Sequence, residues 1–129
     1  MNKIDRLVGV KVFGWELRLD KDGAEVWYTK RANAFEKQYD CSPIVHGPNF
    51  TTEIAAAMEV WGNPHVVRHV EYLAPSVDED KGTVLHWVSA VNINGVRRGC
   101  TSVNPAMALC EAALQAVGVS WSEIQEAMR

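Results

Sequence analysis

The stretch TVLHWVSAVNINGVRRGCT, residues 83–101, decides the fold. Residues 83–93 are rich in the β-branched and aromatic side chains that are typical of strands, and residues 96–101 are expected to form a return strand. Between them lies Asn94-Gly95, a pair suited to the two-residue type I′ turn, in which both central residues take a positive φ. The sequence therefore predicts an antiparallel hairpin at this point.

The residues that follow the hairpin predict two helices. Asn104 is a typical helix cap and Pro105 suits the first helical position, while Gly118 ends the helix. Ser120 begins a capping-box pattern for a short last helix that runs through Met128. The expected buried side of the first of these helices consists of Met107, Leu109, Cys110, Ala113, Leu114 and Val117.

The residues before the hairpin predict two further helices and more strands. We expect a helix over 2–13 capped by Asn2, a hairpin over 15–29, a helix over 51–61, a strand over 65–73 and a polar loop over 74–82. In the helix over 51–61 we expect a threonine to be the cap. Its buried face is expected to hold Ile54, Ala57, Met58 and Trp61.

Residues 30–50 are the least regular part of the chain, and a loop of that length in a compact domain is usually functional. The order of elements favours an α+β fold. We expect one domain over residues 1–129, with an antiparallel sheet of four or five strands covered by helices in an α-β-α sandwich-like arrangement.

Composition narrows the classes of function. The 129 residues carry 13 Lys and Arg against 16 Asp and Glu, a net charge of −3. This balance argues against direct binding of nucleic acid or of an anionic membrane. No apolar run approaches the roughly 20 residues of a membrane helix. The three cysteines are scattered and odd in number, which suits reduced thiols in the cytoplasm.

Catalytic and metal-binding patterns are weak. His65 and His69 are four residues apart, but on a strand that spacing separates them by about 13 Å, too far for one zinc ion. His86 is not joined by a cysteine or carboxylate at a recognisable spacing. Cys100 and Cys110 are expected to be core residues, and Cys41 lacks a positioned base. We therefore predict no catalytic residues, no metal and no cofactor.

A binding site for a phosphorylated ligand is the more specific prediction. The densest supply of hydrogen-bond donors near a helix start consists of Arg97, Arg98, Thr101, Ser102 and Asn104. Only one of the two arginines can face such a site, because neighbouring strand residues point to opposite faces. Thr51 and Thr52 mark a second helix start, beside which Trp27 or Tyr28 offers a ring for stacking. The alternative is that the arginines solubilise an exposed hairpin and that a helix or another subunit covers the ring.

Three segments of the chain resemble the phage ABA-sandwich domain family. They are IDRLVGVKVFGW (4–15), NFTTEIAAAMEVW (49–61) and SVNPAMALCEAALQAVGV (102–119), and they occur in the order typical of that family. The chain differs in its long segment over 30–48, and Met58 stands where the family's second helix usually has tryptophan. The resemblance implies a phage or prophage protein that acts inside the bacterial cell.

The resemblance leaves three functions open. The first is a non-enzymatic homo-oligomer that sequesters a nucleotide-derived immune signal, for example a cyclic ADP-ribose variant. The second is a protein–protein inhibitor of a host defence or nucleic-acid-processing protein. The third is an enzyme that cleaves such a signal with His69 or His86.

Overall fold

The computed structural model describes the backbone of residues 2–19, 21–33, 38–44 and 49–129, and the side chains of these residues outside 29–48. The elements in chain order are α1 (Lys3–Leu7), a π-helical turn η1 (Val8–Val12), β1 (Glu16–Leu19), β2 (Glu25–Asn33), β3 (Gln38–Ile44), α2 (Ile54–Trp61), α3 (Pro64–Val67), β4 (Val70–Val77), β5 (Val84–Ile93), β6 (Val96–Ser102), α4 (Pro105–Ala116) and α5 (Trp121–Met128).

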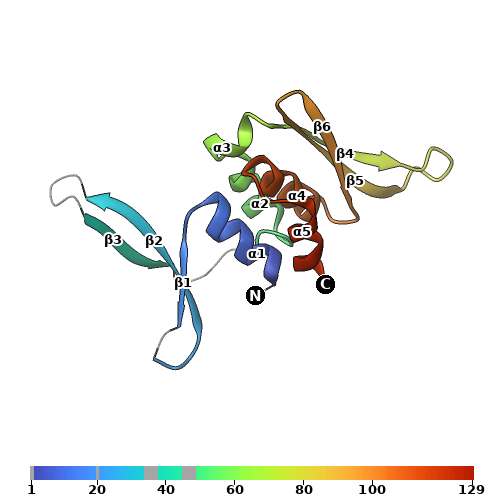
Figure 1. Ribbon diagram of the computed structural model, residues 1–129. Coiled ribbons are helices and arrows are strands. Elements are labelled where there is room, and N and C mark those ends of the chain that lie inside the picture. Colours follow the sequence, from blue (N-terminus) through green and yellow to red (C-terminus); the bar gives the residue numbers. More distant parts are fainter. Residues whose placement is uncertain (1, 20, 34–37, 45–48) are drawn as a thin grey trace.

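The fold is α+β with antiparallel strand pairing, as the sequence predicts. The described strands form two sheets of three, in the orders β1-β2-β3 and β4-β5-β6. The expected count of four or five strands is thus approximate, and the strands are divided between two sheets. Figure 1 shows these sheets on different sides of the central helices.

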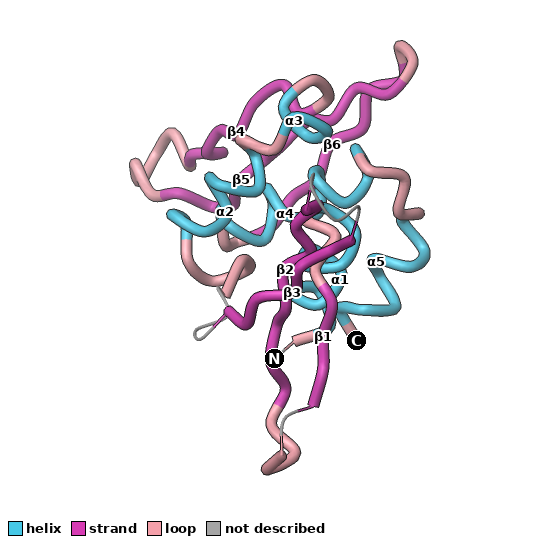
Figure 2. The backbone as a smooth tube through the Cα atoms, turned by 90° about the vertical axis from the view of Figure 1, so that its left-hand side faces the viewer, coloured by secondary structure: helices cyan, strands magenta, loops and turns pink. Residues whose placement is uncertain are grey.

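Helix α4 forms the centre of the core. It packs against all three strands of the second sheet and against α2, α3, α5 and η1. The turned view in Figure 2 shows α4 in the middle, between α2 and α5. The unbroken run 108–115 is buried, so this helix is enclosed on nearly every side. Leu109, Cys110, Ala113 and Leu114 are fully buried as predicted.

The hairpin of β5 and β6 confirms the prediction from Asn94-Gly95. Ile93 pairs with Val96, so the turn has two residues. The φ angles of Asn94 and Gly95 are 52° and 82°, both positive as a type I′ turn requires.

The helix caps are mostly those that the sequence predicts. The side chains of Asn2, Asn104 and Ser120 each accept a hydrogen bond from a backbone N–H in the first turn of α1, α4 and α5 respectively. The predicted helix over 2–13 is divided into α1 and the wider turn η1. Within that turn, Gly9 lets the ring of Trp27 pack directly on the helix backbone, because a Cβ there would lie 2.7 Å from the ring carbon Cη2.

Helix α2 differs from the prediction in its start and in its buried face. Its cap is Glu53, whose side chain makes no capping hydrogen bond, while Thr51 is held by hydrogen bonds to other segments. Ile54 and Met58 are about half exposed. The residues of α2 that are buried are Ala56, Ala57 and Val60.

The strand predicted over 65–73 is wrong in its first half. Asn63 caps a short helix, α3, with Pro64 at its first position, the same device as Asn104-Pro105 at α4. The strand β4 begins only at Val70 and continues through Pro75 into the predicted loop. A proline fits there because β4 is an edge strand of its sheet.

The irregular segment predicted over 30–50 contains regular structure. Its first residues extend β2, and residues 38–44 form β3, which pairs antiparallel with β2. Strand pairing provides order that the propensities of the individual residues do not reveal. The side chains of Tyr39 and Cys41 lie outside the described residues.

None of the helices in the described ranges has the length and apolar character that crossing a bilayer requires.

Candidate functional site

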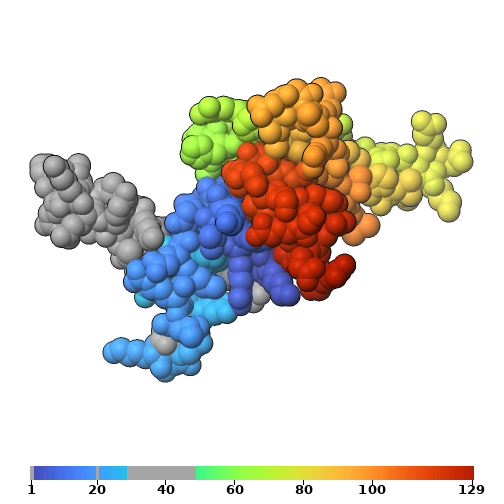
Figure 3. Space-filling model, viewed as in Figure 1, coloured from blue at the N-terminus to red at the C-terminus, as the bar shows by residue number. Residues whose placement is uncertain are grey.

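Strand β6 and the two C-terminal helices border a hollowed surface. In Figure 3 the surface of β6, in orange, directly adjoins that of the C-terminal helices, in red. Two hollows of about 360 and 560 Å³ lie there, and Trp121, at the start of α5, lines both of them. We call the first the Arg98 hollow, the second the Glu111 hollow, and the two together the β6–α5 groove.

The two arginines of β6 lie on opposite faces of the sheet, as strand alternation predicts. Arg98 pairs with Val91, which is fully buried on the face that packs against α4. On the same face, the hydroxyl of Ser89 donates a hydrogen bond of 2.7 Å to the backbone carbonyl of Ala108 in α4. Arg98 therefore emerges at the helix side of the strand, where it lines the first hollow together with Gln115 and Trp121.

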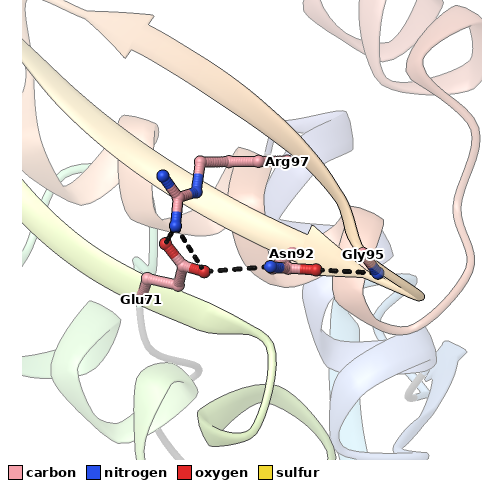
Figure 4. A network of polar contacts seen from close by, with 4 residues as sticks. All are labelled: Glu71, Asn92, Gly95 and Arg97. Atoms are coloured by element: carbon pink, nitrogen blue, oxygen red, sulfur yellow. Dashed lines mark hydrogen bonds and ion pairs between the residues drawn. The ribbon is translucent and has the colours of Figure 1, made fainter.

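Arg97 belongs to a separate network on the other face. Its guanidinium lies 2.9 Å from the carboxylate of Glu71, which also accepts a hydrogen bond of 3.1 Å from the side-chain amide of Asn92. The Asn92 side-chain oxygen accepts in turn from the backbone N–H of Gly95 in the turn (Figure 4). Arg97 is thus paired with Glu71 of β4 and is not among the residues that line the groove.

The Glu111 hollow contains an unusual acid. Glu111 lies on α4 and is only 3% exposed, and its Oε2 has no hydrogen-bond partner in the described part of the structure. Burial raises the pKa of this carboxyl from its ordinary value of 4.5 to about 7. A perturbed carboxyl in a hollow is a candidate functional group.

The remaining lining of this hollow is mixed. Thr101 and Ser102 from β6 and Asn2 before α1 provide polar groups, while Ile4, Met107 and the end of α5 provide apolar ones. No lysine, arginine or histidine is among the described residues that line it. Among the described residues, Glu111 therefore has no cationic partner in the hollow.

Cys100 also lines the Glu111 hollow, but its thiol is not an activated nucleophile. Its Sγ accepts a hydrogen bond of 2.9 Å from the side-chain amide of Gln115. Burial, and secondarily the nearby Glu111, raise the pKa of the Cys100 thiol to about 11. A thiol with that pKa is protonated at neutral pH. Cys110 is fully buried in the core, as predicted.

The structure brings only part of the predicted ligand site together. Arg98, Thr101 and Ser102 line the groove. Asn104 lies behind it, where its side-chain amide donates a hydrogen bond of 2.6 Å to the backbone carbonyl of Thr51. Its other side-chain atom, Oδ1, caps α4.

The second predicted helix start and its rings lie elsewhere. Thr51 is buried and Thr52 does not begin a helix. Trp27 is 1% exposed, because it packs between Gly9 and Trp15, so its ring is closed to a ligand. Tyr28 is partly buried, and the guanidinium of Arg18 lies 4.7 Å from its ring centre.

Three groove residues were not predicted from the sequence. Glu111 is the single charged residue in the apolar run ALCEAAL, residues 108–114. That isolated charge is the signal by which the sequence could have indicated a functional residue. Gln115 follows one turn later on α4. Trp121 lies in the capping-box pattern that begins at Ser120, which predicts a helix start and nothing about a site. Its place beside β6 depends on tertiary packing.

The described histidines, His65, His69 and His86, lie apart from one another in the fold. Within the described ranges no group of three or more His, Cys, Asp or Glu residues is placed to hold a metal ion. His65 lies on α3 rather than on a strand, and Nδ1 of His69 lies 3.1 Å from the backbone carbonyl of Asn92. His86 pairs with Ser76 at the other end of β5.

The chain matches no family model, no curated protein and no solved structure. The groove is therefore interpreted from its own geometry.

Proposed function

We propose that this protein is a non-catalytic binder of a small nucleotide-like molecule, which it holds in the β6–α5 groove. The observation that supports this most directly is the combination of Arg98 at one hollow, Glu111 at the other and the ring of Trp121 beside both. An arginine fork suits a phosphate, and an indole ring suits stacking by a base. Hollows of this size fall in the range of small-molecule sites.

The biological role that we propose rests on the resemblance to phage ABA-sandwich proteins. In that role a phage or prophage protein, located in the cytoplasm of the bacterial host, sequesters a nucleotide-derived immune signal such as a cyclic ADP-ribose variant. Sequestration needs tight binding without turnover. The groove suits this because its acid has no positioned catalytic partner among the described residues: the nearby Cys100 thiol is protonated, and His69 and His86 do not line either hollow.

The test uses the two arginines as matched variants. Wild-type protein, Arg98→Ala and Arg97→Ala are incubated with the products of a cyclic-nucleotide or TIR-type synthase, washed and denatured, and the released molecules are identified by mass spectrometry. Loss of a bidentate arginine contact costs about 1.5–3 kcal/mol, which is a ten- to hundredfold weakening. We expect retention by wild type and Arg97→Ala and its loss in Arg98→Ala.

The other outcomes separate the alternatives. Equal retention by wild type and Arg98→Ala, or no retention by any of the three proteins, would contradict the proposal. A ligand that is released in chemically altered form would indicate an enzyme. A stoichiometric host protein in a pull-down, without a small molecule, would favour the protein–protein inhibitor.

A further inference from the structure

The Glu111 hollow contains a hydrogen-bond acceptor that the fold leaves unused. The Oε2 atom of Glu111 is buried and has no partner among the described residues. A buried polar atom without a partner destabilises the folded state, and native structures pair the great majority of such atoms. The unpaired acceptor therefore points to a ligand group that donates to it.

Two other polar side chains of this hollow, those of Asn2 and Ser102, make hydrogen bonds within the fold. The side chain of Asn2 accepts from the backbone N–H of Asp5 at 2.7 Å and donates to the hydroxyl of Thr51 at 2.8 Å. The hydroxyl oxygen of Ser102 accepts from the backbone N–H of Asn104. The carboxyl of Glu111 differs from these groups, because its Oε2 atom accepts no hydrogen bond from the described residues.

The charge of the hollow selects against a phosphate at this end. When Glu111 is ionised, an anionic group beside it would be repelled, and no described cation in the hollow offsets that repulsion. Arg98, which suits an anion, lines the other hollow. The two ends of the groove thus suit opposite ends of one molecule.

The side chains of the lining favour a flat donor group. The Trp121 ring borders the hollow, and Met107 and Met128 provide adaptable apolar contacts. A carboxylate accepts two parallel N–H bonds from neighbouring donors. Two adjacent N–H donors on a planar ring are the arrangement found on the Watson–Crick edge of guanine.

We propose that the Glu111 hollow recognises the N–H donor edge of a guanine-type base, while Arg98 holds the phosphate of the same nucleotide. This rests on the proposed function and specifies its ligand class.

Two probes that differ by one amino group test this assignment. Guanosine 5′-monophosphate carries both donors, whereas inosine 5′-monophosphate lacks the exocyclic amine. Binding of each to wild-type protein, Glu111→Gln and Arg98→Ala is measured by isothermal titration calorimetry. We expect wild type to bind the guanine nucleotide at least tenfold more tightly than the inosine nucleotide, because the second N–H bond to a buried carboxylate is lost with the latter.

The ratio of the two affinities is a readout that a merely structural change would not shift. In Glu111→Gln we expect this preference to fall to less than threefold, because the new side-chain amide is a donor that opposes the base. In Arg98→Ala we expect both affinities to fall by a similar factor and the preference to remain. Circular dichroism confirms that each variant is folded.

Results that contradict the role of Glu111 can be told apart from results that contradict the proposed function. Equal binding of the two nucleotides by wild type, or a preference that survives in Glu111→Gln, overturns the assignment of Glu111. If Arg98→Ala still weakens the binding of both nucleotides in that case, the proposal that the groove binds a nucleotide is kept. Absence of binding of either nucleotide to wild type overturns the guanine assignment, and the extraction experiment then decides the proposed function by itself.

Discussion

Replacing Glu111 by glutamine should make the protein more stable above neutral pH. The carboxyl is buried without a partner for Oε2, and burial raises its pKa from 4.5 to about 7. Each pKa unit corresponds to about 1.4 kcal/mol, so ionising this group in the folded state costs about 3 kcal/mol relative to the unfolded chain. Glutamine has nearly the same shape and no charge, so the variant avoids this cost.

The effect has a defined pH dependence. Below about pH 4.5 the carboxyl is protonated in both states, and its contribution to stability is intact. Between about pH 4.5 and 7 the folded protein keeps a proton that the unfolded chain releases, so the free energy of unfolding falls as the pH rises. Above about pH 7 the loss is complete. The advantage of Glu111→Gln should therefore grow from near zero at pH 4.5 to about 3 kcal/mol at pH 8.

Urea unfolding at pH 4.5, 6 and 8, followed by far-UV circular dichroism, measures this difference. At pH 8 the thermal midpoint should rise by about 10 °C, given the unfolding entropy typical of a chain of this size. Glu59→Gln on the exposed side of α2 is the matched control and should follow the wild-type profile within about 0.5 kcal/mol. If Glu111→Gln is no more stable than wild type at pH 8, or if its advantage is the same at all three pH values, the buried, ionisable description of Glu111 is refuted.

Three further predictions concern packing, capping and assembly. Gly9→Ala should destabilise the fold by about 1–3 kcal/mol in urea unfolding, because the new Cβ would lie 2.7 Å from the Trp27 ring. Gly62→Ala is the control and should have little effect, because the neighbours of its Cβ are no closer than 3.6 Å. Equal effects of the two substitutions would contradict the close contact at Gly9. Asn104→Ala should lower the free energy of unfolding by about 2–3 kcal/mol, because it removes both the cap of α4 and a hydrogen bond to Thr51. Ser120→Ala should lower it by about 1 kcal/mol, because it removes only the cap of α5. A larger loss in Ser120→Ala than in Asn104→Ala would contradict this. The protein should self-associate as a dimer or higher closed oligomer, because β4 and β6 are the edge strands of the second sheet in the part of the chain that the structure describes. A mass of 14.4 kDa in light scattering at micromolar concentration would refute this.

The hairpin and the caps could be predicted because they depend on few neighbouring residues. Asn94-Gly95 adopts its turn through the φ angles that these two residues tolerate, and Asn104-Pro105 starts a helix by local hydrogen bonding. Asn63-Pro64 has the same capacity and starts α3, but it also directly follows the helix predicted over 51–61 and suits the end of that helix. A pattern that can both end one helix and start another is ambiguous without knowledge of what packs on either side.

The groove could be predicted only in part, because it forms between elements that are distant in sequence. Strand alternation correctly separates Arg97 from Arg98, but it does not indicate which of them meets the helices. That depends on which face of the hairpin covers α4. Likewise, Trp27 was expected as an accessible ring, but Gly9 leaves room for it in the core. Exposure of an aromatic residue on a strand is a tertiary property.

The separation of Arg98 from Glu111 also bears on the choice between a ligand binder and a protein inhibitor. An inhibitor that mimics nucleic acid needs a broad acidic surface, and a net charge of −3 provides little of one. The groove has a cation at one hollow and a buried acid at the other, which fits our proposal of one small molecule that is anionic at one end and donates hydrogen bonds at the other. Retaining an unpaired acid lowers the stability of the fold by several kcal/mol at neutral pH and above, and packing alone gives no reason to keep it. In the function that we propose, recognition of a donor group accounts for an acid, rather than a leucine, at position 111 of α4.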